Sequence, residues 1–232
     1  HLIKNNSNLG FSKANNIGIN YSIDNFNPDY FLLLNHDTVV ENNLLATLIF
    51  WENYFDNSAA LSPMILIKNN NKIWWVGTKI FRIKDLFKNL KLSLSYHEFK
   101  EERYKDGLLN DPRKVEAISG CSLFLPKKIL DDVGHLDERF FMYGEDLDYS
   151  IRIKNKGYGL FAIPGTIVYH DIFLENKSLK EKSNLKKTLK RYFNHVKSSF
   201  ILLVIHFSFI YSVIWVLRLP LAFIYEIKGR IK

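Results

Sequence analysis

Five consecutive large apolar residues, Tyr30–Leu34, constrain the fold of this chain more than any other feature of its sequence. Such a run is typical of a strand in a sheet that is covered on both faces. It ends abruptly at the polar residues 35–38, and short apolar runs alternate with amphipathic stretches on either side of it. The alternation predicts an α/β domain in which helices flank the sheet.

Hydrophobic periodicity also predicts the other elements. Ser12 is a candidate N-cap for the first helix, and Gly157 is expected to end a later one. Residues 83–113 are charged and lack clear periodicity, so we expect a variable excursion there. Beyond the strand at 30–34, the pattern predicts helices at 12–24, 43–55, 127–133 and 145–156, and strands at 59–62, 72–76, 115–125, 158–163 and 166–170.

The net charge of +8 is concentrated at one end of the chain. Residues 1–175 contain 20 basic and 22 acidic side chains, a net charge of −2, whereas residues 176–232 contain 12 basic and 2 acidic ones, a net charge of +10. We therefore expect a domain over 1–175 and a basic, hydrophobic helical tail over 176–232. The single cysteine, Cys121, cannot form an internal disulfide, which favours a reducing compartment.

The tail contains an apolar run at 200–217, whose length lies at the lower limit for crossing a bilayer. One interpretation is a helix pair that packs on the body or on another subunit. The other, which we favour, is attachment to an anionic membrane surface. Basic residues on both sides of the run suit an in-plane or re-entrant helix better than a simple span. Nucleic-acid binding is not expected, because these basic residues flank an apolar helix instead of lying among aromatic residues on a folded face.

Two residues stand where α/β sheets place ligands. Asp37 follows the carboxyl end of the buried strand at 30–34, and its carboxylate could coordinate a divalent cation that holds phosphates. The alternative is that Asp37 caps the following helix or accepts hydrogen bonds from loop amides. His170 ends the last predicted strand, where a histidine is more often a structural residue than a ligand.

Glu145, Asp146 and Asp148 crowd three carboxylates into four residues at the start of a predicted helix. Negative charge there is stabilised by the helix dipole, and Asp148 can pair with Arg152 one turn later. Aromatic residues precede the cluster, however, and a carboxyl group in a partly dry pocket can have a pKa suited to general-base catalysis. The pattern leaves both interpretations open.

Taken in order, four blocks of this sequence resemble the family-2 glycosyltransferases with the GT-A fold, and especially their bacterial rhamnosyltransferase-like branch. The resemblance extends over roughly residues 5–171 and implies a mixed, Rossmann-like sheet flanked by helices. The blocks are residues 8–18 (NLGFSKANNIG), 33–38 (LLNHDT), 118–138 with its Ser119-Gly120-Cys121, and 140–148 (FFMYGEDLD) with Arg152, Gly157 and His170.

The resemblance implies metal-assisted transfer of a sugar from a nucleotide-diphosphate sugar to an acceptor hydroxyl, with inversion. Asp37 would bind Mg²⁺ or Mn²⁺ against the donor diphosphate, and His170 would complete that site. Asp146 would be the catalytic base, and Glu145 would orient the acceptor or the base. The donor pocket would be formed by Asn8, Gly10, Phe11, Asn16, Asn35, Asp37 and Gly120.

The family's first strand and its acidic nucleotide-binding loops lie upstream of the block at 8–18, and the chain does not begin with Met. We therefore expect an N-terminally incomplete domain that alone binds nucleotide weakly. The expected donor is dTDP-rhamnose, followed by UDP-galactofuranose, UDP-hexoses and GDP-sugars. The expected acceptor is a saccharide or a lipid-linked saccharide, and the expected location is the cytoplasmic face of the bacterial cell membrane, in cell-surface polysaccharide synthesis. The alternative is a non-catalytic or decayed membrane-bound fragment that acts as a scaffold.

Overall fold

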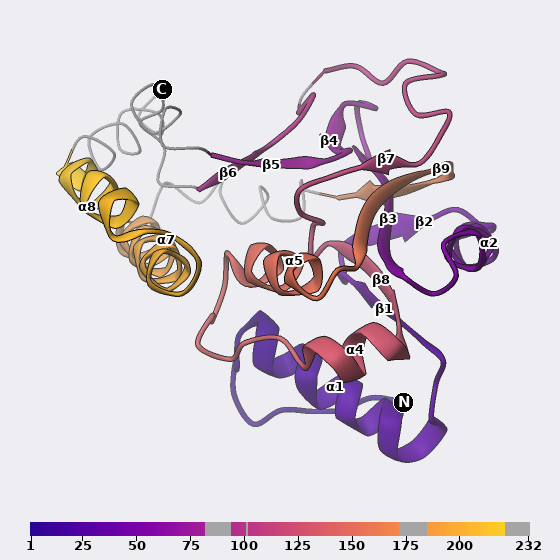
Figure 1. Ribbon diagram of the computed structural model, residues 1–232, viewed down its shortest axis with the longest axis horizontal. Helices are drawn as coiled ribbons and strands as arrows, with labels where there is room; N and C mark the ends of the chain where they lie inside the picture. The colour runs from indigo at the N-terminus through magenta and orange to yellow at the C-terminus, as the bar shows by residue number, and fades with distance from the viewer. Residues whose placement is uncertain (82–93, 101, 172–184, 221–232) are drawn as a thin grey trace.

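The computed structural model describes residues 1–81, 94–100, 102–171 and 185–220, with the side chains of 185–188 left out. Its centre is a seven-stranded mixed sheet (Figure 1). Strands β3 and β9 are parallel, and the other pairs in this sheet are antiparallel. The main path runs β1 (Tyr30–Leu34), β8 (Ser122–Pro126), β3 (Ala59–Ile67), β9 (Gly159–His170) and β2 (Thr38–Val40), with β4 (Ile73–Trp75) on β3 and β7 (Arg113–Lys114) on β9.

Helices cover the sheet, as the apolar strands require. All nine residues of β3 are buried, which explains why its sequence does not alternate. Helix α2 (Leu44–Tyr54) packs on β3 and β9, α4 (Lys127–Val133) on β8, and α5 (Glu145–Asn155) on β9. Helix α1 (Phe11–Phe26) lies beside α4 (Figure 1). These contacts confirm the predicted fold, a mixed sheet flanked by helices.

Three predicted boundaries were wrong. Strand β3 extends to Ile67, because its pairing with β9 continues well past Ser62. Strand β8 begins at Ser122, so the preceding Ser119–Cys121 segment lies in a turn. The dipeptide Pro164-Gly165 does not divide β9, because a bulge opposite β3 accommodates a proline that has no N–H to donate.

The first helix also begins differently from the prediction. Helix α1 starts at Phe11 after Gly10, and no side chain caps its first turn. Ser12, the predicted N-cap, is fully buried instead. Within the expected excursion at 83–113, β6 (Ser95–His97) pairs with β5 (Thr78–Ile80), which precedes the excursion, and the excursion ends at the first residue of β7. Its remaining part at 82–93 lies outside the described residues.

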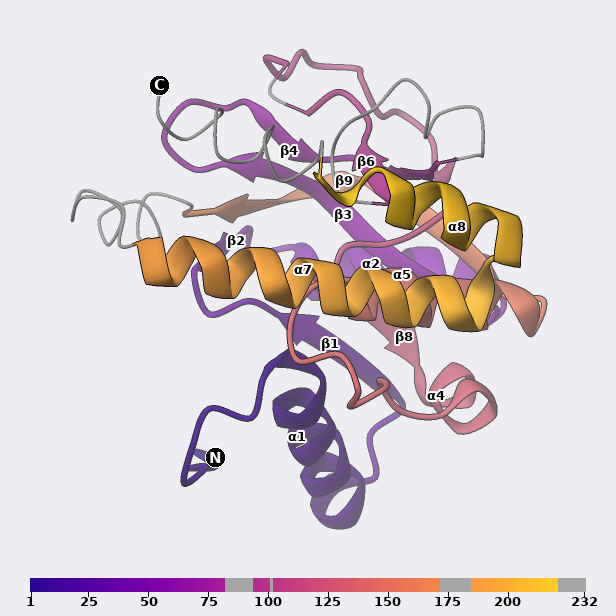
Figure 2. The ribbon, with the colours of Figure 1, turned by 90° about the vertical axis from the view of Figure 1, so that its left-hand side faces the viewer.

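The apolar run of the tail is divided between two helices that pack on the body. Helix α7 (Leu185–His206) ends before Ser208, whose hydroxyl accepts a hydrogen bond from the N–H of Tyr211 (3.4 Å) at the start of α8 (Phe209–Leu217). Figure 2 shows the two helices crossing in front of α5 and the sheet. Their buried residues share one apolar cluster with the body: Leu202, Leu203, Tyr211 and Trp215 meet Leu94, Ala117, Phe140 and Leu147.

This packing confirms the interpretation of the tail as a helix pair resting on the body. None of the helices within the described residues is both long and apolar enough to cross a membrane. Three of the eight basic residues that precede the apolar run, Lys177, Lys180 and Lys182, lie outside the described part of the chain.

Candidate active site

Asp37 and His170 meet at the edge of the sheet where β1 and β9 end. Oδ1 of Asp37 lies 3.2 Å from Nε2 of His170, and the two side chains are only 8% and 7% exposed. Antiparallel pairing of β2 with β9 sets this approach, because Thr38 lies opposite His170 and the N–H of Asp171 donates to the carbonyl of Asp37 (2.8 Å). The rings of Trp74 and His170 pack edge to face, with centroids 4.7 Å apart.

This pair has the chemistry of a cation site. The contact between Asp37 Oδ1 and His170 Nε2 lacks the geometry of a hydrogen bond, and His170 Nδ1 is buried without a hydrogen-bond partner. Buried polar atoms in this state are costly unless a ligand compensates. One carboxylate oxygen and one imidazole nitrogen suit Mn²⁺, and the carboxylate suits Mg²⁺. Within the described residues, no group of three or more His, Cys, Asp or Glu side chains could hold a metal, so a cation here would take its remaining ligands from water or from a bound phosphate.

Glu145 and Asp146 form the second cluster, at the first turn of α5. Asp146 accepts hydrogen bonds from the N–H groups of Gly120 (Oδ2, 3.2 Å) and Leu147 (Oδ1, 2.8 Å), which hold its carboxylate at the turn before β8. Desolvation raises the pKa of Asp146 despite these bonds. Burial and the adjacent charge of Asp146 raise the pKa of Glu145 to about 8, and its Oε2 has no hydrogen-bond partner.

The N-terminal block reaches this second cluster through the aromatic turn before α5. Position 10 has no room for a side chain, because a Cβ on Gly10 would lie 2.3 Å from the carbonyl oxygen of Phe141. The same carbonyl accepts a hydrogen bond from the N–H of Phe11 (2.8 Å). Asn8 accepts a hydrogen bond from the N–H of Gly10 (3.0 Å). A Cβ on Gly120 would lie 3.2 Å from the Phe11 ring. Asn8, Gly10 and Phe11 are thus brought next to Gly120.

The turn before β8 connects the two clusters. The N–H of Asn35 donates to the carbonyl of Cys121 (3.0 Å), and the neighbouring Gly120 donates to Asp146. Burial and the nearby charge of Asp37 together raise the pKa of the Cys121 thiol in this turn to about 12. The cation candidate and the base candidate therefore flank one turn at the same edge of the sheet.

Asn16 has a different environment from the other predicted donor residues. Its amide is buried, donates to the carbonyl of Leu136 (2.8 Å) and to Glu138 (3.2 Å), and accepts from the N–H of Leu136 (3.1 Å). These bonds tie α1 to the loop that precedes the aromatic turn. A part for Asn16 in the donor pocket remains a prediction.

Asp148 forms the predicted pair with Arg152, whose Nε lies 2.8 Å from its Oδ2. Arg152 also donates to the carbonyls of Val133 and His135 (3.0 Å each), which fixes the chain before the aromatic turn. Sequence reasoning missed the second partner of Asp148, His206 of α7, at 2.7 Å. The available signal was an isolated histidine within an otherwise apolar run.

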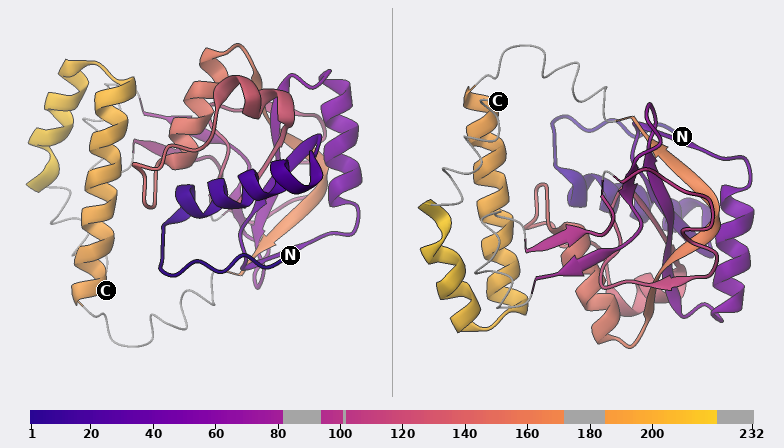
Figure 3. Two further views of the ribbon diagram at one scale, coloured as in Figure 1. Left: turned by 90° about the horizontal axis from the view of Figure 1, so that it is seen from below. Right: turned by 90° about the horizontal axis from the view of Figure 1, so that it is seen from above.

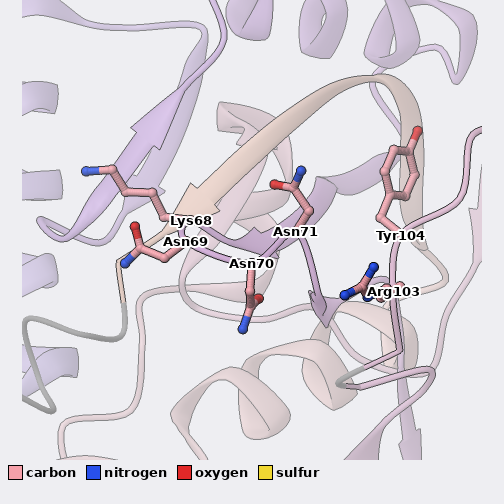
Figure 4. A pocket seen from close by; sticks show the side chains of 6 residues that line it. All are labelled: Lys68, Asn69, Asn70, Asn71, Arg103 and Tyr104. Carbon is pink, nitrogen blue, oxygen red and sulfur yellow. The ribbon is translucent and has the colours of Figure 1, made fainter.

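A polar surface pocket of about 540 Å³ lies beside the cation candidate. Lys68 joins the two, since its backbone N–H donates to the carbonyl of His170 (3.1 Å) and its Nζ pairs with Asp171 (3.2 Å). Figure 4 shows the amide, cationic and phenolic side chains that line the pocket, a composition suited to polar ligands. The lining residues are Lys68, Asn69, Asn70, Asn71, Arg103 and Tyr104.

Comparisons with known proteins identify the family of this chain. The chain is 28% identical over 160 residues to the low-salt glycan biosynthesis hexosyltransferase Agl10 of Haloferax volcanii, covering 67% of this chain and 47% of that protein. It is 26% identical over 191 residues to the rhamnosyltransferase WbbL of Escherichia coli, covering 78% of this chain and 69% of that protein. The chain thus spans about half and two thirds of these two relatives.

Among solved structures, GalNAc-T7 in complex with UDP, GalNAc and Mn²⁺ matches with a TM-score of 0.56. The match has 16% sequence identity and covers 73% of this chain and 32% of that one, so it establishes the GT-A fold alone. A family model for the glycosyl transferase family group 2 matches residues 30–229. Because this match covers most of the chain, the protein belongs to the family-2 glycosyltransferases.

Proposed function

We propose that this protein transfers a sugar from a nucleotide-diphosphate sugar to an acceptor hydroxyl, with a rhamnose donor as the first candidate. One observation carries the proposal. The turn at 119–121 connects a base candidate, Asp146, with a cation candidate, Asp37 and His170, at one edge of the sheet. Transfer of a sugar needs both functions close together, because a proton leaves the acceptor while charge develops on the departing diphosphate.

In this proposal, Asp146 accepts the proton of the acceptor hydroxyl. The acceptor oxygen then bonds to the anomeric carbon as the bond from that carbon to the diphosphate breaks, and the nucleoside diphosphate leaves. A single displacement of this kind inverts the anomeric configuration. The raised pKa of Asp146 suits a general base, because a base is most effective when its pKa approaches the working pH.

Glu145, in the same turn, is expected to be protonated, unlike the proton-accepting Asp146. With a pKa of about 8 it is mostly protonated at pH 7, so it can donate a hydrogen bond as well as accept one. This favours a part in orienting the acceptor or Asp146. A divalent cation held by Asp37 and His170 would neutralise negative charge on the diphosphate.

The experiment is a transfer assay with dTDP-rhamnose, UDP-galactofuranose, UDP-hexoses and GDP-sugars, using saccharide and lipid-linked acceptors. We expect transfer with one donor, inversion in the product by NMR, loss of transfer with EDTA and recovery with Mn²⁺ or Mg²⁺. Asp146→Asn and Asp37→Ala should both be inactive, while Glu102→Gln, on the exposed surface, serves as the control. Full activity in both site variants would overturn the site, and no transfer with any donor would favour the scaffold alternative.

We also propose that the tail attaches the enzyme to the cytoplasmic face of the cell membrane, with a lipid-linked acceptor. The outer surface of α7 and α8 supports this. Phe193, Phe200 and Val204 of α7 are 63%, 52% and 66% exposed, and Lys190 and Lys197 are exposed on the same helix. Exposed apolar residues combined with basic ones are typical of helices that lie in a membrane interface. On α8 the exposed apolar residues are Phe209, Ile210, Val213, Val216 and Leu217.

Sedimentation with vesicles tests this attachment. The protein should bind vesicles containing phosphatidylglycerol more strongly than neutral phosphatidylcholine vesicles, and the double change Phe200→Ser and Phe209→Ser should weaken binding several-fold. Phe50→Ser is the matched control, because Phe50 is 62% exposed on α2, at the opposite end of the molecule from α7 and α8 (Figures 1 and 3). Equal weakening by both changes, or no binding by the unchanged protein, would contradict the proposal.

A further inference from the structure

The turn that precedes α5 has a costly backbone conformation. Tyr143 and Gly144 have consecutive positive φ angles, 72° and 84°. A bulky residue such as tyrosine seldom adopts such an angle, and it does so only where the surroundings hold it there. Glu145 and Asp146 follow immediately, so the conformation of this turn sets where both carboxylates lie.

Helix α7 contacts each of the three residues at the end of this turn. The hydroxyl of Ser198 donates to the carbonyl of Met142 (3.0 Å). The ring of Tyr143 stacks on that of His195, with centroids 4.3 Å apart and planes 14° apart.

Leu202 and His206 extend the contacts of α7 with the turn and with α5. A Cβ on Gly144 would lie 2.8 Å from Cδ1 of Leu202, so the side chain of Leu202 lies directly against this glycine. Further along, Nε2 of His206 lies 2.7 Å from Oδ1 of Asp148, and these two side chains are 8% and 1% exposed. The contacts thus extend from the turn into α5.

The four contacting residues of α7 form one stripe. Positions 195, 198, 202 and 206 recur at intervals of three and four residues, which places them on one face of the helix. The exposed apolar residues Phe193, Phe200 and Val204 are out of step with this stripe, on the surface of α7 that faces away from the turn. One helix therefore carries both the support of the turn and the proposed membrane surface.

We propose that this stripe, His195, Ser198, Leu202 and His206, is a positioning element for Glu145 and Asp146. It holds the Met142–Gly144 turn in its left-handed conformation and fixes the first turn of α5 through Asp148. The inference rests on the proposed function, because it assigns the two carboxylates their part in transfer. The stripe acts through the turn and through Asp148.

The first test is hydrogen–deuterium exchange, which needs no substrate. His206→Leu removes the partner of Asp148, whereas His206→Gln keeps a side-chain N–H that can donate to it. We expect amide exchange in residues 144–148 to rise at least tenfold in His206→Leu, to return toward the original rate in His206→Gln, and to stay unchanged in Val204→Ala on the exposed face. Exchange in β3 should stay unchanged in all three variants.

The second test is steady-state kinetics with the donor that the transfer assay identifies, starting with dTDP-rhamnose. His206→Leu and Ser198→Ala should each lower kcat about tenfold and leave the donor KM within twofold, and His206→Gln should restore most of the activity. A purely structural attachment of the tail would lower the amount of folded enzyme and change neither constant. Unchanged exchange at 144–148 in His206→Leu would overturn the inference whether or not the protein is active. A protein with normal exchange behaviour that transfers no sugar would contradict the proposed function alone.

Discussion

Nε2 of His206 lies 2.7 Å from Oδ1 of Asp148, which joins the last turn of α7 to the helix that begins with Glu145 and Asp146. Oδ2 of the same aspartate accepts a hydrogen bond from Arg152. The almost fully buried Asp148 therefore has a partner on each oxygen, as a buried carboxylate requires. The residues beyond 175 are thus part of the support for the candidate site as well as a possible means of attachment.

A chain that ends at residue 175 should consequently be less stable than the intact one. Without α7 and α8, the apolar side chains of Phe140 and Leu147 lose their cover, and Asp148 loses one partner. We expect a lower Tm and increased binding of a hydrophobic dye, measured by thermal denaturation and fluorescence. An unchanged Tm would show that the tail contributes no stability. Membrane attachment is therefore better tested with single changes on the exposed face than with this truncation.

Asp146→Asn should abolish transfer without unfolding the protein. Asparagine keeps an oxygen that can accept the hydrogen bond from Gly120 or Leu147, but it cannot take a proton from the acceptor. Removal of a general base costs about 10²- to 10⁴-fold in rate. In the unchanged enzyme, kcat should rise with pH up to a limit above the ordinary pKa of aspartate, because desolvation raises the pKa of Asp146. Kinetics across pH and circular dichroism of both proteins measure this, and a fully active variant would exclude Asp146 as the base.

Two glycines of the N-terminal block should respond to alanine in opposite directions. Gly10 has φ 82° and ψ 177°, a conformation almost restricted to glycine, and a Cβ there would collide with the carbonyl of Phe141. Gly10→Ala should therefore lower the free energy of unfolding by about 1–3 kcal/mol or more. Gly18 lies inside α1 with open space around its Cα, so Gly18→Ala should raise it by about 0.5–1 kcal/mol. Denaturant titration of both variants tests the pair, and equal effects would contradict the close approach at Gly10.

Local sequence features predicted the fold class, and the family resemblance named the residues of the candidate site, whose roles remain a prediction. The continuous apolar run at 30–34 marked β1, and the polar residues directly after it marked the strand end where Asp37 lies, whereas Gly120 was predicted inside a strand and lies in the turn before β8. The family resemblance implied that Asp37 and His170 act together, and the structure brings them within 3.2 Å of each other. The strand and its end were predictable because hydrophobic runs and the polar residues that end them are local properties of a sequence.

The remaining features depend on contacts between distant parts of the chain. The pairing of His206 with Asp148 spans 58 residues, and no periodic pattern specifies it. The hydrogen bonds of the Asn16 amide to Leu136, 120 positions away, were likewise not predicted. The bulge that keeps β9 continuous through Pro164 is likewise determined by its partner strand β3. In each case tertiary contacts, which composition and spacing do not encode, decide the outcome.

Cys121 should resist alkylation as long as the protein is folded. Its side chain is buried, and burial together with the charge of Asp37 raises the pKa of its thiol to about 12. Only the thiolate reacts rapidly with iodoacetamide, so at pH 8 the folded protein should be labelled far more slowly than the denatured protein. It is the only cysteine in the chain, so the mass shift measures this site directly. Rapid labelling under native conditions would show that the turn at 119–121 opens to solvent.

The contribution of Glu145 and Glu52 to the stability of the folded protein should fall as the pH rises from about 4.5 to 8. Burial raises the pKa of Glu145 to about 8 and that of Glu52 to about 7, from 4.5 for both in the unfolded chain. Below pH 4.5 both states are protonated, and the full stability is present. Above it the unfolded chain ionises first, so the folded state loses stability until its own glutamates ionise.

Two glutamine variants separate the ionisation of Glu145 and Glu52 from the other pH-dependent contributions to stability. Each carboxyl group has a buried oxygen without a partner, so Glu145→Gln and Glu52→Gln remove an ionisation that the fold disfavours. Each should raise Tm at pH 8 relative to the unchanged protein by more than it does at pH 4.5. Glu102→Gln, on the exposed surface, should change Tm equally at both values. If Glu145→Gln instead lowers Tm more at pH 8 than at pH 4.5, the carboxylate is stabilised in the folded state, and Glu145 would then face Asp146 as an anion.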